Sequence, residues 1–218
     1  MKFLKRGLFF TFEGGEGAGK TTLIEKLFFS LTQKGLSVVK TREPGGTQLS
    51  ESVRELLLHR QGFSFFSARS ELCLYLAARA QQVEEVILPA LKEGKIVLCD
   101  RFNDSTIAYQ GYGRGLDVKE VGHFCSFVSQ HLVPDLTFFL DLDPKKGLER
   151  GRKATHKPGY DRIEQEGELF HQKVRQGYYA LAEKEKQRFR ILDAALSLEE
   201  VFVVAWKEME QAVSLALS

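Results

Sequence analysis

The feature that most constrains this chain is the segment GGEGAGKT at residues 14–21, which follows a short apolar run at residues 8–12. It fits the pattern G-x-x-x-x-G-K-[ST] and lies between a strand-like and a helix-like segment, where that pattern forms a phosphate-binding loop. Glycines let backbone N–H groups converge on phosphate oxygens, and the following helix N-terminus adds positive potential. The chain is therefore predicted to bind a nucleoside triphosphate through Gly14, Gly15, Glu16, Gly17, Ala18, Gly19, Lys20, Thr21 and Thr22.

Four side chains are expected to act on the phosphates or on the metal ion bound to them. Lys20 can reach the β- and γ-phosphates, and the Thr21 hydroxyl can ligate Mg²⁺, the expected cofactor. Asp100 and Arg101 follow a second strand-like run, and ligands gather at the carboxyl edge of such a sheet. We expect Asp100 to hold Mg²⁺ through water and Arg101 to offer a bidentate fork to a phosphate.

Composition limits the class of protein. With 218 residues and a net charge of +2, a single globular domain is expected, and nothing indicates a nucleic-acid or membrane surface. No run approaches the roughly 20 apolar residues of a membrane span. The basic start is followed by too short an apolar stretch for a secretory signal, and the three cysteines lack C-x-x-C spacing. We therefore expect a cytoplasmic protein that contacts neither nucleic acid nor membrane.

Five short apolar runs predict buried parallel strands at residues 8–12, 37–40, 96–99, 136–142 and 189–192. Helical patterns alternate with them, including residues 70–91, 118–131, 169–187 and 198–217. This alternation predicts an α/β protein with a five-stranded parallel sheet flanked by helices. Two stretches interrupt the alternation: a mostly helical insertion at about 41–91, expected to carry an acceptor site, and a charged, glycine-interrupted lid at about 147–168.

Four blocks together resemble one enzyme family. They are the phosphate loop, TREPGGT at residues 41–47, DRF at 100–102 with AYQGYGRG at 108–115, and DRIE at 161–164. Their order and content resemble bacterial thymidylate kinases over about residues 8–193. The resemblance implies the P-loop kinase fold and a homodimer. It also implies dTMP kinase activity, the transfer of the ATP γ-phosphate to dTMP that yields dTDP for dTTP synthesis.

The resemblance also implies roles for residues on the acceptor side. Glu16 would accept a hydrogen bond from the 3′-hydroxyl of the sugar, and Arg101 would hold the acceptor phosphate. Tyr75 would stack on thymine, and Arg79, one helical turn later, would contact the edge of the base. The remaining acceptor residues would be Ser105, Tyr109 and Gln110 along the nucleoside, and Arg42 or Glu43 near the phosphate or its metal.

A second group of expected catalytic residues lies in the lid. Gly17 stands where some relatives carry an arginine, and relatives without it place arginines in the lid instead. The lid of this chain carries Arg150, Arg152, Lys153 and Arg162. We expect Arg150 or Arg152 to approach the migrating phosphoryl group, and the sequence leaves open which one does.

Two alternatives stay open at this stage. A kinase of the same fold could act on another nucleoside monophosphate or on a deoxynucleoside, and a panel of acceptors would separate these. A nucleotide-dependent switch would hydrolyse ATP slowly without any acceptor.

Overall fold

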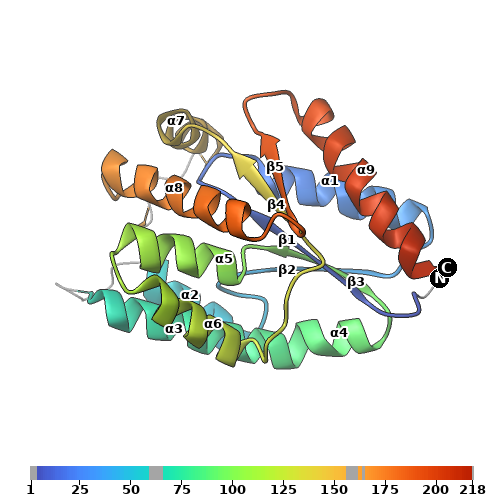
Figure 1. Ribbon diagram of the computed structural model, residues 1–218, viewed down its shortest axis with the longest axis horizontal. Coiled ribbons are helices and arrows are strands. Elements are labelled where there is room, and N and C mark those ends of the chain that lie inside the picture. Colours follow the sequence, from blue (N-terminus) through green and yellow to red (C-terminus); the bar gives the residue numbers. More distant parts are fainter. Residues whose placement is uncertain (1–3, 59–65, 156–161, 164, 218) are drawn as a thin grey trace.

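Five parallel strands form one sheet in the order β2-β3-β1-β4-β5 (Figure 1). The computed structural model describes residues 4–58, 66–155, 162–163 and 165–217. The strands are β1 (Leu8–Glu13), β2 (Val38–Arg42), β3 (Ile96–Asp100), β4 (Leu136–Asp141) and β5 (Phe189–Asp193). All five predicted runs form strands, and four of them continue further at the carboxyl end, because backbone pairing extends past the last apolar residue.

The register of the central strands brings polar side chains to one edge. Phe12 of β1 pairs with Asp100 of β3, and Asp100 also pairs with Arg42 of β2. Glu13 comes directly after Phe12, so an acidic residue ends each of the two central strands. Ligands of open parallel sheets bind at this carboxyl edge.

Side chains alternate between the two faces of the sheet. Phe10 and Leu98 pack with α1 (Lys20–Gln33) and α9 (Leu198–Leu217). Phe9 and Val97 pack on the other face with η1 (Val83–Ile87) and α4 (Leu88–Lys92). Figure 1 shows these helices as layers on both sides of the sheet.

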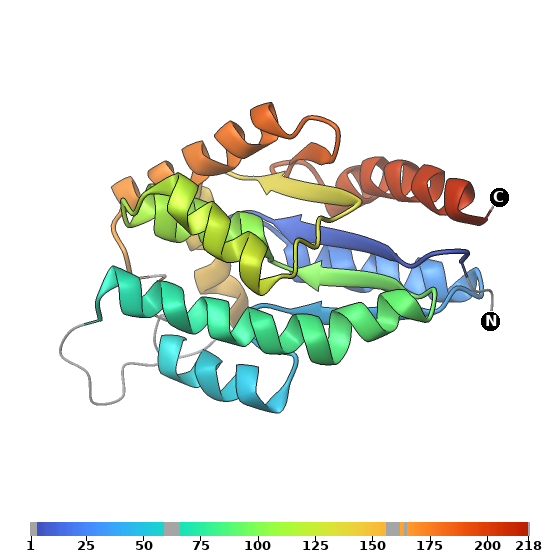
Figure 2. The ribbon, with the colours of Figure 1, turned by 60° about the horizontal axis from the view of Figure 1, so that its bottom comes forward.

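The predicted insertion is helical where the structure describes it. It holds α2 (Gln48–Leu58) and α3 (Ala68–Gln82), and α3 runs through the π-helical turn η1 into α4. Figure 2 shows α3 and its continuation as one long rod beside the sheet, with α2 packed against it. Val53 and Leu57 of α2 meet Ala78 of α3 at that contact.

Helices after β3 differ in part from the expectation. Sequence reasoning placed no element over α5 (Asn103–Thr106) and η2 (Ile107–Gly113), which are helical turns ahead of α6 (Val118–Val128). The helix predicted at 118–131 ends early, because Gln130 and His131 have left-handed φ angles of 52° and 59°. α8 (Glu168–Lys184) ends three residues before the predicted boundary.

The beginning of the expected flexible lid is a helix, α7 (Pro144–Thr155). Proline suits the first turn of a helix. The Asp143 carboxylate accepts hydrogen bonds from the backbone N–H groups of Lys145 at 3.1 Å and Lys146 at 3.2 Å, so Asp143 caps this helix. Within the described residues, none of the helices is long and apolar enough to cross a membrane.

Candidate active site

The phosphate loop connects β1 to α1 at the carboxyl edge of the sheet. Gly14 and Gly17 have φ angles of 138° and 66°, which side chains with a Cβ rarely adopt. The Lys20 ammonium donates to the carbonyl oxygens of Gly14 at 3.2 Å and Gly15 at 2.8 Å. Burial and the nearby Arg101 lower the pKa of Lys20, while Glu16 opposes this shift. The amine therefore lies across the loop.

The two predicted metal-site residues meet at the end of β3. The Thr21 hydroxyl donates to Asp100 Oδ2 at 3.1 Å, so a hydroxyl and a carboxylate lie side by side next to the phosphate loop. Such oxygen ligands suit Mg²⁺, which binds through a few protein oxygens together with waters and substrate phosphates. Ala18 packs into the core, and Thr22 lies exposed in the first turn of α1.

Arg101 adopts a strained backbone conformation that carries its side chain over the loop. Its φ is 74°, a value that costs free energy for a residue other than glycine and often marks a functional site. Its guanidinium donates to Gly14 O at 2.9 Å and to Glu16 Oε1 at 2.6 Å. The same group lies 5.1 Å from the centroid of the Tyr109 ring. Arg101, Glu16 and the loop therefore form one cluster.

Glu16 is held in its ionised form by this cluster. Burial alone would raise the pKa of its carboxyl, but Arg101 and Lys20 outweigh that effect and lower the pKa to about 2. A carboxylate among phosphate-binding amides thus has cationic partners of its own.

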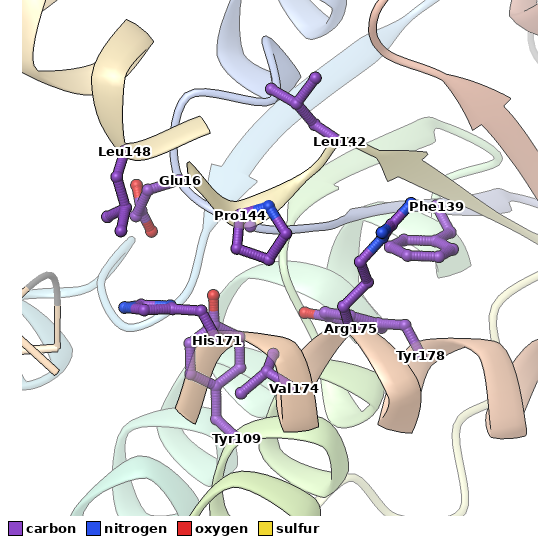
Figure 3. A pocket seen from close by; sticks show the side chains of 11 residues that line it. Glu16, Tyr109, Phe139, Leu142, Pro144, Leu148, His171, Val174, Arg175 and Tyr178 are labelled. Carbon is purple, nitrogen blue, oxygen red and sulfur yellow. The ribbon is translucent and has the colours of Figure 1, made fainter. Parts of the chain in front are cut away.

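A pocket opens beside Glu16 between the phosphate loop, α7 and α8 (Figure 3). Glu16 and Tyr109, both expected at the acceptor sugar, line it together. Sequence reasoning missed the opposite wall, which α8 supplies. The wall residues recur three and four positions apart, a helical spacing that could have identified them as one face: His171, Val174, Arg175 and Tyr178.

The lid helix contacts the phosphate loop through backbone. A Cβ placed on Gly17 would lie 2.1 Å from the carbonyl oxygen of Gly147, and one on Gly147 would lie 2.4 Å from that of Glu16. Both distances are far below van der Waals contact, so the two segments approach this closely only because glycine occupies both positions. An arginine at position 17 would not fit this arrangement.

Most of the acceptor residues expected in the insertion take part in ion pairs, whereas Tyr75 packs between two helices. Arg79 is 1% exposed and donates to the Glu43 carboxylate, to Thr106 Oγ1 at 2.9 Å and to the Phe102 carbonyl at 3.1 Å. Glu43 is thus paired with Arg79, not directed at the phosphate loop. Arg42, which is largely exposed, donates to Glu51 at 3.2 Å. The half-buried Tyr75 packs against the contact between α2 and α3.

A second buried carboxylate, Glu71 of α3, links the insertion to the residues that follow the lid helix. It accepts from Gln110 Nε2 at 2.8 Å and from Arg114 at 3.1 Å, and it is ion-paired with Arg162. Arg114 also pairs with Glu166 at 2.6 Å. Arg162, counted among the lid cations in the sequence, is therefore committed to Glu71 in this conformation.

The remaining expected residues have individual places. The Arg150 guanidinium donates to the Ala194 carbonyl oxygen at 2.7 Å. The side chains of Arg152 and Lys153 lie outside the described residues. The Ser105 hydroxyl donates to the Glu13 carboxylate and accepts a hydrogen bond from Arg101 at 3.3 Å.

Comparisons with known proteins cover nearly the whole chain. The thymidylate kinase family model matches residues 12–203. The thymidylate kinase of Protochlamydia amoebophila (strain UWE25) is 48% identical over 210 residues, 94% of this chain and 93% of that protein. That of Halothermothrix orenii (strain H 168) is 52% identical over 196 residues, 90% of this chain and 93% of that protein. The crystal structure of thymidylate kinase from Ehrlichia chaffeensis has a TM-score of 0.75 at 34% identity, covering 93% of this chain and 98% of that one.

Proposed function

Because this chain belongs to the thymidylate kinase family, we propose that it transfers the γ-phosphate of ATP to dTMP, giving ADP and dTDP for dTTP synthesis. The observation that carries the proposal is the cluster at the carboxyl edge of the sheet. Lys20 donates to the phosphate loop and Thr21 donates to Asp100, and we assign both to the donor, while Arg101 reaches across the loop to Glu16. A phosphate donor and a phosphate acceptor would thus be held by groups that meet at one edge of the sheet.

Phosphoryl transfer needs positioning and charge neutralisation more than covalent chemistry. The loop amides and Lys20 would bind the donor phosphates. Arg101 would exchange the Glu16 carboxylate for the acceptor phosphate, and Glu16 would then be available to accept from the sugar 3′-hydroxyl. No general base is required, because the acceptor phosphate is itself an anionic nucleophile.

The oxygen atoms of Thr21 and Asp100 fit a magnesium ion, Thr21 directly and Asp100 through water. When bound, Mg²⁺ neutralises charge on the donor phosphates. The lid would add an arginine and exclude water, which would otherwise hydrolyse ATP. Arg150 and Arg152 remain the candidates for this arginine, and the ion pair of Arg162 with Glu71 argues against Arg162.

The acceptor nucleoside would lie between the insertion and the pocket beside Glu16. Glu16 and Tyr109 both line that pocket, which supports their assignment to the sugar, with the Tyr109 ring against C2′. Tyr75 would stack on the base, and Gln110 would lie along the nucleoside. Arg79 is buried in its pair with Glu43, so we assign it to holding α3 in place behind the base and no longer to contact with the edge of the base. We also propose a homodimer, which the resemblance implies, and a cytoplasmic location, which the composition favours. Sedimentation of the purified protein would test the dimer.

A panel of acceptors tests the proposal. The protein is incubated with ATP and with dTMP, dUMP, dCMP, dAMP, dGMP or thymidine, and ADP release is followed by a coupled assay. We expect kcat/KM to be highest for dTMP. Preferred phosphorylation of another acceptor would assign a different nucleotide kinase, and slow hydrolysis that no acceptor accelerates would indicate a switch.

A further inference from the structure

Arg101 rests on a buried group of oxygen atoms that the proposed reaction does not use. Glu13, the last residue of β1, is fully buried. Its carboxylate accepts from the backbone N–H of Phe102 at 2.8 Å, from the Ser105 hydroxyl, and from the Tyr178 hydroxyl at 3.1 Å. One carboxylate therefore binds the residue that follows Arg101 and two hydroxyls that accept hydrogen bonds from its guanidinium.

Tyr178 brings α8 into this group. Its ring is fully buried and stacks on Phe139 of β4, with centroids 4.9 Å apart and planes 24° apart. Its hydroxyl lies 2.9 Å from Ser105 Oγ, and one terminal nitrogen of Arg101 donates to that hydroxyl at 3.4 Å. Burial raises the pKa of the Tyr178 phenol well above its usual value, so the hydroxyl keeps its proton.

The two terminal nitrogens of Arg101 thus face different surroundings. One donates to Gly14 O, Ser105 Oγ and Tyr178 OH, which are fixed parts of the fold. The other donates to Glu16, whose side chain is 32% exposed and can move. When one terminal nitrogen of a guanidinium is held by fixed groups, the other keeps a constant direction toward a ligand. Such preorganisation lowers the entropic cost of binding.

We propose that Tyr178, together with Glu13, is a positioning pair that holds the Arg101 guanidinium so that its Glu16-facing edge meets the acceptor phosphate. The inference rests on the proposed function, because it requires an acceptor that carries a phosphate. Neither residue touches the reacting atoms. Their effect passes through Arg101 and applies to the phosphate of the acceptor, not to its base or sugar.

The test compares Tyr178→Phe with Tyr179→Phe in the full chain. The two tyrosines are adjacent in α8, and each variant removes one hydroxyl. The Tyr179 hydroxyl, however, donates to Asp141 at 2.6 Å and not to Glu13. Calorimetry measures the Kd of dTMP and of thymidine, which share base and sugar and differ in the phosphate. We expect Tyr178→Phe to weaken dTMP binding about five- to thirtyfold, since the hydrogen bonds that it loses support a charged group.

Thymidine binding separates positioning from general loss of structure. In Tyr178→Phe, the Kd of thymidine and the KM for ATP should stay near the wild-type values, and Tyr179→Phe should leave all three constants unchanged. Glu13→Leu, which removes both acceptor oxygens, should reproduce the selective loss of dTMP affinity. Equal weakening of dTMP and thymidine, or unchanged dTMP binding, would overturn the proposal while the kinase assignment stands. A wild-type protein that binds dTMP no more tightly than thymidine would instead refute the acceptor-phosphate site itself.

Discussion

The phosphate loop and the helical insertion use the same kind of ion pair in opposite ways. At the loop, the Arg101 and Glu16 side chains are 15% and 32% exposed, and the pair lies beside the pocket. In the insertion, the Arg79 and Glu43 side chains are 2% and 5% exposed, and Arg79 has further partners in Phe102 and Thr106. An open pair can exchange its carboxylate for a phosphate, whereas the closed one ties α3 to the segment that follows β2.

The difference follows from the cost of burying charge. An isolated charge in the interior is costly, so a buried arginine needs its carboxylate, and removing either partner leaves the other uncompensated. A partly exposed arginine can regain water when its partner leaves. We therefore expect substitutions at the loop to affect turnover and substitutions at the closed pair to affect stability.

The largest effect is expected for Lys20→Ala in the phosphate loop, the more exposed of the two regions. A fixed charge on the transferred phosphoryl group contributes on the order of 3–5 kcal/mol, so kcat should fall by roughly two to four orders of magnitude. Calorimetry should show nearly unchanged dTMP binding, and urea unfolding little loss of stability. A variant with near-normal turnover would remove Lys20 from the site.

The closed pair is tested by Arg79→Ala, with Arg101→Ala as its matched counterpart. Leaving Glu43 buried without its cation should lower the free energy of unfolding by about 3–5 kcal/mol. Arg101→Ala should cost no more than about 1 kcal/mol, because Glu16 reaches solvent, but it should raise the KM for dTMP. Urea unfolding of both variants measures these two losses of unfolding free energy. Equal losses would contradict the difference proposed between the open and the closed pair.

Tyr75 tests whether the insertion also contacts a ligand. Stacking on a base contributes about 1–3 kcal/mol, so Tyr75→Ala should raise the KM for dTMP about ten- to hundredfold. Tyr75→Phe keeps the ring and should behave like the wild type. Steady-state kinetics with dTMP and dCMP measure both variants, and an unchanged KM in Tyr75→Ala would confine the acceptor to the loop side.

A smaller effect concerns pH and the buried Glu13. Burial and the neighbouring Asp104 raise the pKa of Glu13 from 4.5 to about 8, outweighing Ser105 and Arg101. A carboxyl group whose pKa is raised on folding stabilises the protein in full below its unfolded pKa and loses that contribution as the pH rises through the folded value.

The free energy of unfolding of the wild type, relative to Glu13→Gln, should therefore fall between about pH 4.5 and about pH 8. The decrease should reach at least about 1.4 kcal/mol, the equivalent of one pKa unit. Urea unfolding of both proteins across this range measures the difference, and a constant difference would contradict the prediction.

The sequence predicted what depends on local pattern. Strands, the phosphate loop and the meeting of Thr21 with Asp100 follow from apolar runs, glycine spacing and the shared edge of a parallel sheet. The support of Arg101 could not be predicted, because Glu13 and Tyr178 are 165 residues apart and meet only once α8 has packed on β4. Glu71 likewise gains its arginines from two distant segments.

The contact between Gly17 and Gly147 makes substitutions at these two places interdependent. A larger residue in the loop would have to displace α7, and a larger residue in α7 would have to displace the loop. Two segments far apart in the sequence are therefore constrained together, since a side chain at either position alone would separate the lid helix from the loop or distort the loop.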